Sequence, residues 1–178
     1  MVNVQSSSWN SADRARCVVN LAVAPEPWLR WQRASLGAGM PTAVSESLGL
    51  YRIRLHPSSA PTGVDVWWEV TDEGSAFEAA QDMVVGLEAD GWSLLKRLLT
   101  REGMLSQIRS GDLGVMHRAS LGVFFARAEA LMLMDKGPSS ALDEQLDFAM
   151  RNVIAGQAED ARRFDVWVRE QTRHATER

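Results

Sequence analysis

The run from Arg14 to Ala24 constrains the fold of this chain more than any other stretch. Alternate positions along it are all apolar, namely Ala15, Cys17, Val19, Leu21 and Val23. This period of two is typical of a β-strand with one face in a hydrophobic core, and it turns Arg14, Arg16 and Asn20 to the opposite face. We therefore expect a central strand here, around which the rest of a sheet is built.

Two antiparallel hairpins are predicted around this strand. Val2–Ser6 also alternates, and a turn-forming segment joins it to Arg14–Ala24, which predicts the first hairpin. Leu50–His56 and Val64–Val70 alternate on either side of a turn rich in Pro, Ser and Gly, which predicts the second. The apolar faces of both hairpins are expected to join in one core.

From Thr71 the apolar period lengthens to about 3.6 residues, the period of an α-helix. Ser75 and Glu78 have the spacing of a capping box, so a helix is expected to begin there. Its buried stripe would consist of Phe77, Ala80, Val84 and Leu87. A short helix is also expected from Trp28 to Leu36, and the last third of the chain has helical periodicity throughout.

These elements predict an α+β fold with an antiparallel sheet of about four strands backed by helices. The sheet and its helices would occupy residues 1–112. An all-helical C-terminal segment, residues 113–178, would pack on them. At 178 residues the chain is long enough for one domain with a substantial core and a helical extension.

Composition limits the classes of partner. The net charge of −4 gives no general attraction to nucleic acid or anionic membranes. The last predicted helix does carry a basic stripe, but acidic neighbours dilute the charge of Arg162, Arg163, Arg169 and Arg173. Cys17 is the single cysteine, which rules out an intrachain disulfide. With no signal-like or membrane-length apolar run, we expect a soluble, cytoplasmic protein with neither a membrane nor a nucleic acid as its partner.

No catalytic, metal or cofactor motif is recognisable in the sequence. The histidines His56, His117 and His174 are far apart and have no metal-ligand spacing. Phosphate-binding glycine loops and the G-x-S-x-G nucleophile motif are absent from the sequence. We therefore assign no catalytic residue, no metal ligand and no cofactor. Of the three, His56, at the end of a predicted strand, is the first candidate for a functional residue, and a surface histidine is the favoured interpretation even there.

The outer face of the predicted sheet carries the one constellation with the character of a binding surface. On it, Arg52 and Arg54 would stand opposite Asp65 and Glu69 on the facing strand. Arginine and tryptophan carry much of the energy at protein interfaces. The candidate surface consists of Asn20, Arg52, Arg54, Asp65, Trp67 and Glu69. In the competing interpretation, a helix covers this face and Trp67 is a buried packing residue.

Two functions from different classes follow. The first is a noncatalytic protein-interaction module, by analogy of class including immunity proteins that neutralise a toxin. The alternative is a small-molecule-binding protein or enzyme with a pocket between sheet and helices. That pocket would be bordered by Trp67, Arg52 and Arg54 or, on the other face, by Trp9 and Trp92. A deep pocket with converging polar groups would favour the alternative.

The first part of the chain resembles the DUF4304 family, small bacterial α+β proteins of undetermined function. The resemblance rests on the paired strands Val2–Asn10 and Arg16–Val23, and extends loosely through Tyr51–Arg54, Trp68–Val70 and Trp92–Leu95. It implies a sheet with helices and contains no catalytic motif. Family members begin with a helix and a further strand before the segment corresponding to Val2. We therefore expect the edge at Val2–Ser6 to be covered by a later segment or by self-association.

Overall fold

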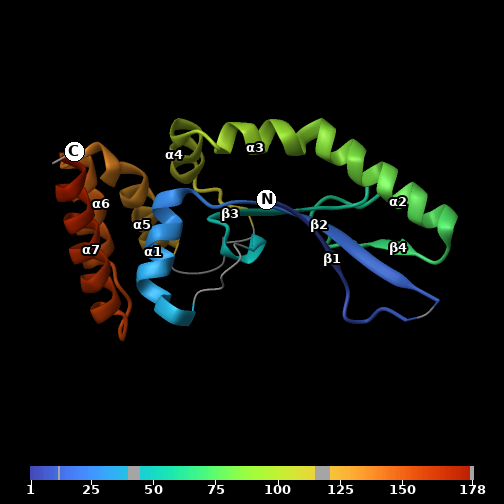
Figure 1. The fold of residues 1–178 in the computed structure, drawn as a ribbon, viewed down its shortest axis with the longest axis horizontal. Helices are drawn as coiled ribbons and strands as arrows, with labels where there is room; N and C mark the ends of the chain where they lie inside the picture. The colour runs from blue at the N-terminus through green and yellow to red at the C-terminus, as the bar shows by residue number, and fades with distance from the viewer. Residues whose placement is uncertain (12, 40–44, 115–120, 177–178) are drawn as a thin grey trace.

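Four strands form one antiparallel sheet in this chain (Figure 1). The computed structural model describes residues 1–11, 13–39, 45–114 and 121–176. The strands are β1 (Val2–Ser6), β2 (Ala15–Val23), β3 (Tyr51–Leu55) and β4 (Trp68–Val70). Together with helices on one face and a helical C-terminal part, they confirm the predicted α+β class.

The central position of β2 is confirmed, but the predicted second hairpin is wrong. β1 pairs along one edge of β2, with Val4 opposite Val19. On the other edge, β3 pairs with residues 19–23 and β4 with residues 15–17. β2 has nine residues and its neighbours five or three, so one edge of β2 accepts two short strands end to end. β3 and β4 therefore join the sheet through β2 and not through each other.

A helical arc covers one face of the sheet (Figure 1). It consists of α2 (Glu73–Gly86), a π-helical turn (Leu87–Gly91) and α3 (Trp92–Leu98), followed by α4 (Arg101–Arg109). The predicted start is wrong by three residues, because Asp72 is the N-cap and Ser75 is the third residue of the helix, at the far end of the capping box. Asp72 accepts from the Ser75 N–H, and the Ser75 hydroxyl oxygen accepts from the Asp72 N–H.

The predicted buried stripe of α2 is also wrong in most of its members. Phe77, Ala80 and Val84 are exposed, and Leu87 is partly buried. The residue that α2 buries is Ala79, with Met83 packed partly against the core. The physical reason is that α2 lies over β4, whose three residues cover only a narrow line of the helix.

The C-terminal helices pack with the first helix of the chain. α1 (Glu26–Leu36) follows β2 directly and agrees with the predicted helix apart from a start two residues earlier. Trp31 of α1 meets Phe164 edge-on, with ring centroids 4.9 Å apart. Trp28 meets Phe124 in the same way at 5.7 Å. The helices packed around α1 and one another are α5 (Leu121–Leu133), α6 (Ser140–Arg151) and α7 (Ala158–Thr176).

Aromatic packing thus ties residues before position 112 to residues after it. The division of the chain at that position remains a prediction. In the part of the chain that the structure describes, no helix combines the length and apolar character needed to cross a lipid bilayer.

Candidate functional site

The face of the sheet opposite the helical arc is hollowed by a cleft of about 510 Å³. β2 and β3 form its floor, and the loops before β3 and after it form its walls. Six of its lining side chains are polar or charged and two are apolar. The cleft is lined by Asn20, Glu46, Arg52, Ile53, Arg54, His56, Gly63, Val64, Asp65 and Gly114.

Arg54 is the most constrained side chain of the cleft. Its Nε donates to Asn20 Oδ1 at 3.1 Å, and its Nη1 donates to Asp65 Oδ2 at 2.9 Å. The guanidinium carbon lies 5.2 Å from the centroid of the Trp67 ring, a cation–π contact. Asn20 in turn donates from Nδ2 to Gln5 Oε1 at 2.9 Å. Arg54 is therefore held in one orientation before any ligand arrives.

Asn20, which the sequence placed on the candidate binding surface, is buried. Val18 and Ala22, which share this face, are buried as well. The covering segment is the 3₁₀ turn η2 (Glu46–Leu48) with Gly49, which lies against Ala22. The turn thus covers the Ala22 end of the outer face, where Glu46 and Arg52 line the cleft, while Asn20, Arg54 and Asp65 line it farther from the turn.

Arg52 forms the second ion pair of the cleft. Its Nη2 lies 2.6 Å from Glu46 Oε1, and both side chains are mostly buried. The backbone of Arg52 also accommodates Gly114, which forms a parallel bridge with it. Gly114 has φ +71°, and a Cβ there would lie 1.7 Å from the Arg52 carbonyl oxygen. Only glycine fits this position, because any side chain would push the wall of the cleft away from β3.

The loop between β3 and β4 carries Asp65 and Trp67, and hydrogen bonds to Asp82 of α2 hold it in place. The Asp82 Oδ2 accepts from the Ser58 N–H and from Trp68 Nε1, each at 2.9 Å. The Ser58 N–H, followed by the Trp68 indole, holds the pKa of the Asp82 carboxyl below its usual value, because both stabilise the charged form. His56 Nδ1 lies 3.1 Å from the Val66 carbonyl oxygen and joins the two ends of the loop.

This anchor predicts an acid-sensitive contribution to stability. A carboxyl with a depressed folded pKa stabilises the fold above its ordinary pKa near 3.8, and this stabilisation is lost as pH falls through the folded value. We expect Asp82→Asn to lower the free energy of unfolding at pH 7 by about 1 kcal/mol. The difference from the wild type should shrink on acidification to pH 3, as measured by urea unfolding at both pH values.

Asp147→Asn, at an exposed position of α6, is the matched control and should alter neither value. An Asp82→Asn variant as stable as the wild type at pH 7 would show that the loop is held by other contacts.

The structure brings together four of the six residues predicted for the surface. Asn20, Arg52, Arg54 and Asp65 line the cleft. Trp67 lies beside it, half-buried against Arg54, so it is neither a free surface residue nor a core residue. Glu69 lies elsewhere: it binds Arg16 of β2 and Arg14, which directly precedes β2, and these contacts, the Arg14 hydrogen bond first, lower the pKa of its carboxyl.

Sequence reasoning missed the loop residues of the cleft. Glu46 lies shortly before β3 and Gly114 lies far from the strands in sequence, and nothing in the local pattern of either residue marks it. His56 was singled out and does line the cleft. His117 lies outside the described residues, and His174 is in the last turn of α7. In the described ranges no group of three or more His, Cys, Asp or Glu side chains is placed to hold a metal ion.

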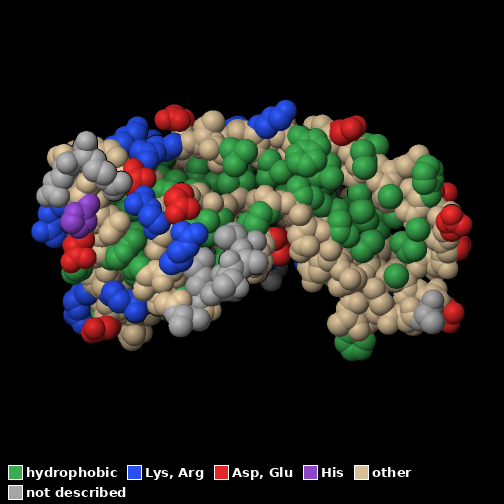
Figure 2. Space-filling model, viewed as in Figure 1, with side chains coloured by type: hydrophobic (Ala, Val, Ile, Leu, Met, Phe, Trp, Pro, Cys, Tyr) green, Lys and Arg blue, Asp and Glu red, His purple; other side chains and the backbone are tan. Residues whose placement is uncertain are grey.

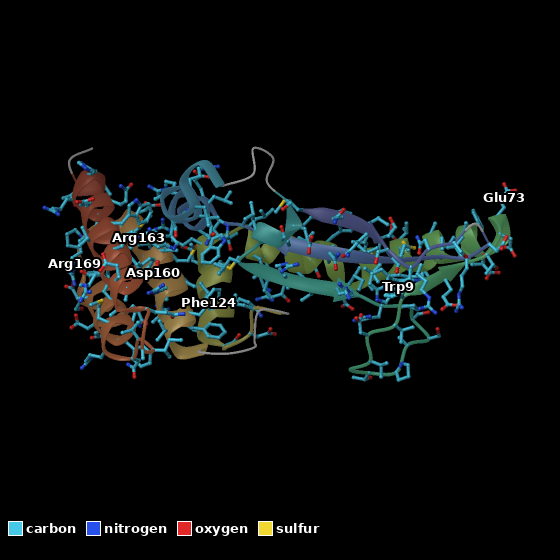
Figure 3. The ribbon with its side chains drawn as sticks, turned by 90° about the horizontal axis from the view of Figure 1, so that it is seen from below. Trp9, Glu73, Phe124, Asp160, Arg163 and Arg169 are labelled. Atoms are coloured by element: carbon cyan, nitrogen blue, oxygen red, sulfur yellow. The ribbon has the colours of Figure 1, made fainter. Side chains whose placement is uncertain are left out.

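The other surfaces considered in the sequence are arranged differently. Trp9 is 87% exposed in the β1–β2 hairpin (Figure 3) and does not line the apolar cavity that Trp92 lines. The basic stripe of α7 is engaged in ion pairs, since Arg163 contacts Asp160 at 2.9 Å and Arg169 contacts Asp143 at 2.7 Å. Its charge is therefore largely offset within the helical part.

The fold and the cleft define an α+β protein with an open antiparallel sheet, one face covered by helices and the other hollowed and polar. Residues 1–97 match the family described as a domain of unknown function (DUF4304), which is more than half of the chain. The chain belongs to this family, as the resemblance of its strands implied. The match spans all four strands and most of α3. No curated protein and no solved structure matches the chain.

Proposed function

We propose that this chain is a noncatalytic protein-interaction module whose partner binds the cleft on the outer sheet face. The observation that carries this proposal is Arg54, held by Asn20 and Asp65 and stacked on Trp67. Arginine and tryptophan dominate the energetic hot spots of protein interfaces. Because both side chains are already ordered, little conformational entropy is lost when a partner engages them.

The character of the lining favours a protein partner over a small molecule. Small-molecule pockets are mostly apolar with few polar groups, whereas most side chains lining this cleft are polar or charged. Arg52 and Arg54 are each paired with a carboxylate, so a small anion would find no net positive charge. A protein surface with charges of both signs complements such an arrangement.

A small-molecule ligand is the second candidate, and the size of the cleft favours it. Its volume of about 510 Å³ lies within the range of known ligand pockets, roughly 300–1,000 Å³. Such a ligand would need hydrogen-bonding groups for both ion pairs. Purification of the chain from its native host distinguishes the two candidates. A protein should co-purify with it in the first case and a small metabolite in the second.

Trp67→Ala tests the proposed surface. With the partner co-purified from the native host, we expect the dissociation constant to rise about 30-fold, equivalent to about 2 kcal/mol, as for an interface hot spot. The free energy of unfolding should fall by less than about 1 kcal/mol, because the substitution removes one cation–π pair from the free protein. Affinity is measured by calorimetry and stability by urea unfolding.

Trp9→Ala is the matched control, since Trp9 lies in a hairpin turn away from the cleft. It should change neither affinity nor stability. Unchanged affinity in Trp67→Ala would contradict the proposed surface, and a loss of several kcal/mol in stability would make Trp67 a packing residue.

Other features of the proposal rest on analogy or on composition. Neutralisation of a toxin by an immunity protein is one form that such an interaction takes, and it remains a prediction here. A cytoplasmic location is proposed from the single cysteine and ordinary soluble composition. Self-association would use a different surface, the outer edge of β1.

A further inference from the structure

The helical arc presents apolar side chains to solvent. Phe77, Val84 and Val85 of α2 are exposed, as is Trp92 of α3, and Leu99 after α3 is 75% exposed. Hydrophobic side chains gather along this arc in Figure 2. Proteins that remain monomeric rarely leave large apolar patches uncovered, so the arc has the character of an interface.

The outer edge of β1 is open. Among the described residues, no element pairs with the side of β1 away from β2. The strand, Val-Asn-Val-Gln-Ser, contains no charged residue and no proline, the usual devices that prevent one sheet edge from pairing with another. Val4 is 61% exposed in its centre. The edge is therefore a template for a further strand.

The open edge and the apolar arc are continuous. Val2 and Val4 lie opposite Leu21 and Val19, so they point to the face of the sheet that the arc covers. Leu21 itself lies against Gly91 at the start of α3. An apolar cavity of about 640 Å³ joins the two regions, and Val2, Trp92, Leu95 and Leu99 are among its lining residues.

The hydrogen bonding of β1 fixes which of its backbone groups are free. Met1 and Ala22 exchange both backbone hydrogen bonds, and Ser7 donates to Arg16, which places the odd-numbered residues in bonded pairs with β2. The N–H and C=O groups of Val2, Val4 and Ser6 therefore point outward. Val4 is the middle residue of the strand, so two antiparallel copies can pair with Val4 on a two-fold axis and Val2 opposite Ser6.

We propose that a second copy of this chain occupies this edge, pairing β1 with β1 about that axis to form one continuous sheet. An axis perpendicular to the sheet keeps the helical arcs of both copies on the same face. Trp92 and Leu99 of each copy then approach over the valines at the junction. A bound peptide strand would satisfy the backbone of β1 but leave the arc exposed, whereas a second copy covers both.

Charge is compatible with this arrangement. Each chain has a net charge of −4, but few ionic groups lie near the junction: among the described residues that line the cavity beside it, these are the Lys96 side chain and the Met1 amino group, which donates to the Ala22 carbonyl oxygen. Like-charge repulsion across the axis is therefore small. This surface does not overlap the outer-face cleft, and the proposal does not depend on the partner proposed there.

Substitutions of Val4 by residues of opposite charge, studied singly and as a mixture, test the dimer. Side chains opposite each other in an antiparallel pair lie about 4.5–5.5 Å apart, so like charges at this position repel directly. We expect the full chain to sediment at twice the mass of one copy, and Val4→Glu and Val4→Lys each to raise the dimer dissociation constant at least about tenfold. An equimolar mixture of the two variants should dimerise again, which misfolded variants would not do.

Leu99→Glu tests the contribution of the arc and should also weaken the dimer. Val166→Glu, at an exposed position of α7, is the matched control and should leave it intact. Hydrogen exchange of the Val4 and Ser6 amides should slow with increasing protein concentration. A wild-type chain that stays monomeric, a dimer insensitive to the Val4 and Leu99 variants, or a mixture that fails to dimerise would overturn the proposal.

Discussion

Val19→Asp is expected to unfold the sheet. Val19 is 1% exposed in the centre of β2, between Val4 on one side and Leu55 on the other. A carboxylate there would be buried without a partner, at a cost of several kcal/mol, comparable with the whole stability of a typical domain. We expect loss of the cooperative thermal transition seen by circular dichroism at pH 7.

Val4→Asp is the matched control for this prediction. It places the same charge directly across the ladder and on the same face of the sheet, but at a position open to solvent. At low protein concentration its melting temperature should stay close to that of the wild type. An unchanged melting curve for Val19→Asp would remove β2 from the centre of the fold.

Phe164→Ala is expected to cost about 3–5 kcal/mol of unfolding free energy. Phe164 is 1% exposed, contacts the edge of Trp31 and lies beneath the Arg127 guanidinium at 5.2 Å. The truncation leaves a cavity between α1 and α7 that rigid helices cannot fill. Phe148→Ala, at an exposed position of α6, should cost less than about 1 kcal/mol in the same urea titration.

Phe164→Ala also tests the proposed division at residue 112. Because Trp31 follows β2 so closely in the chain, we expect β2 amides and α7 amides to lose hydrogen-exchange protection together. Loss confined to residues 121–176 would instead support a separate C-terminal unit.

Local alternation predicted β1, β2, β3 and the first hairpin, but of the predicted strand Val64–Val70 only Trp68–Val70 is a strand, and the pairing of β3 and β4 was not predicted. The pattern of β2 and β3 says which residues share a face, and Arg52, Arg54 and Asn20 do converge there. It does not say that β3 and β4 both pair with β2, because the choice depends on strand lengths and on where the intervening loop is anchored. For this reason Glu69 does not lie with the other predicted surface residues and instead forms ion pairs with Arg14 and Arg16.

Helix periodicity had a similar limit. Phe77 and Val84 form a regular apolar stripe, and regular stripes usually face a core. Here the sheet beneath α2 is too narrow to cover them, and a sequence pattern carries no information about the width of the neighbouring layer. Gly114 was beyond prediction because its contact with Arg52 is distant in sequence, and Glu46, although only six residues from Arg52, lies in a loop without a periodic pattern.

The joining of β3 and β4 to the same edge of β2 has an evolutionary consequence. The segment between them connects two strands that both pair with β2, so its length can change without altering any pairing register in the sheet. Asp65 and Trp67 are carried on this segment, while Arg52, Arg54 and Asn20 stay on the fixed frame of the strands. A longer or shorter segment in a relative would therefore change the side chains beside the cleft without changing the fold. Exchanging this segment between relatives is expected to transfer the specificity for the binding partner.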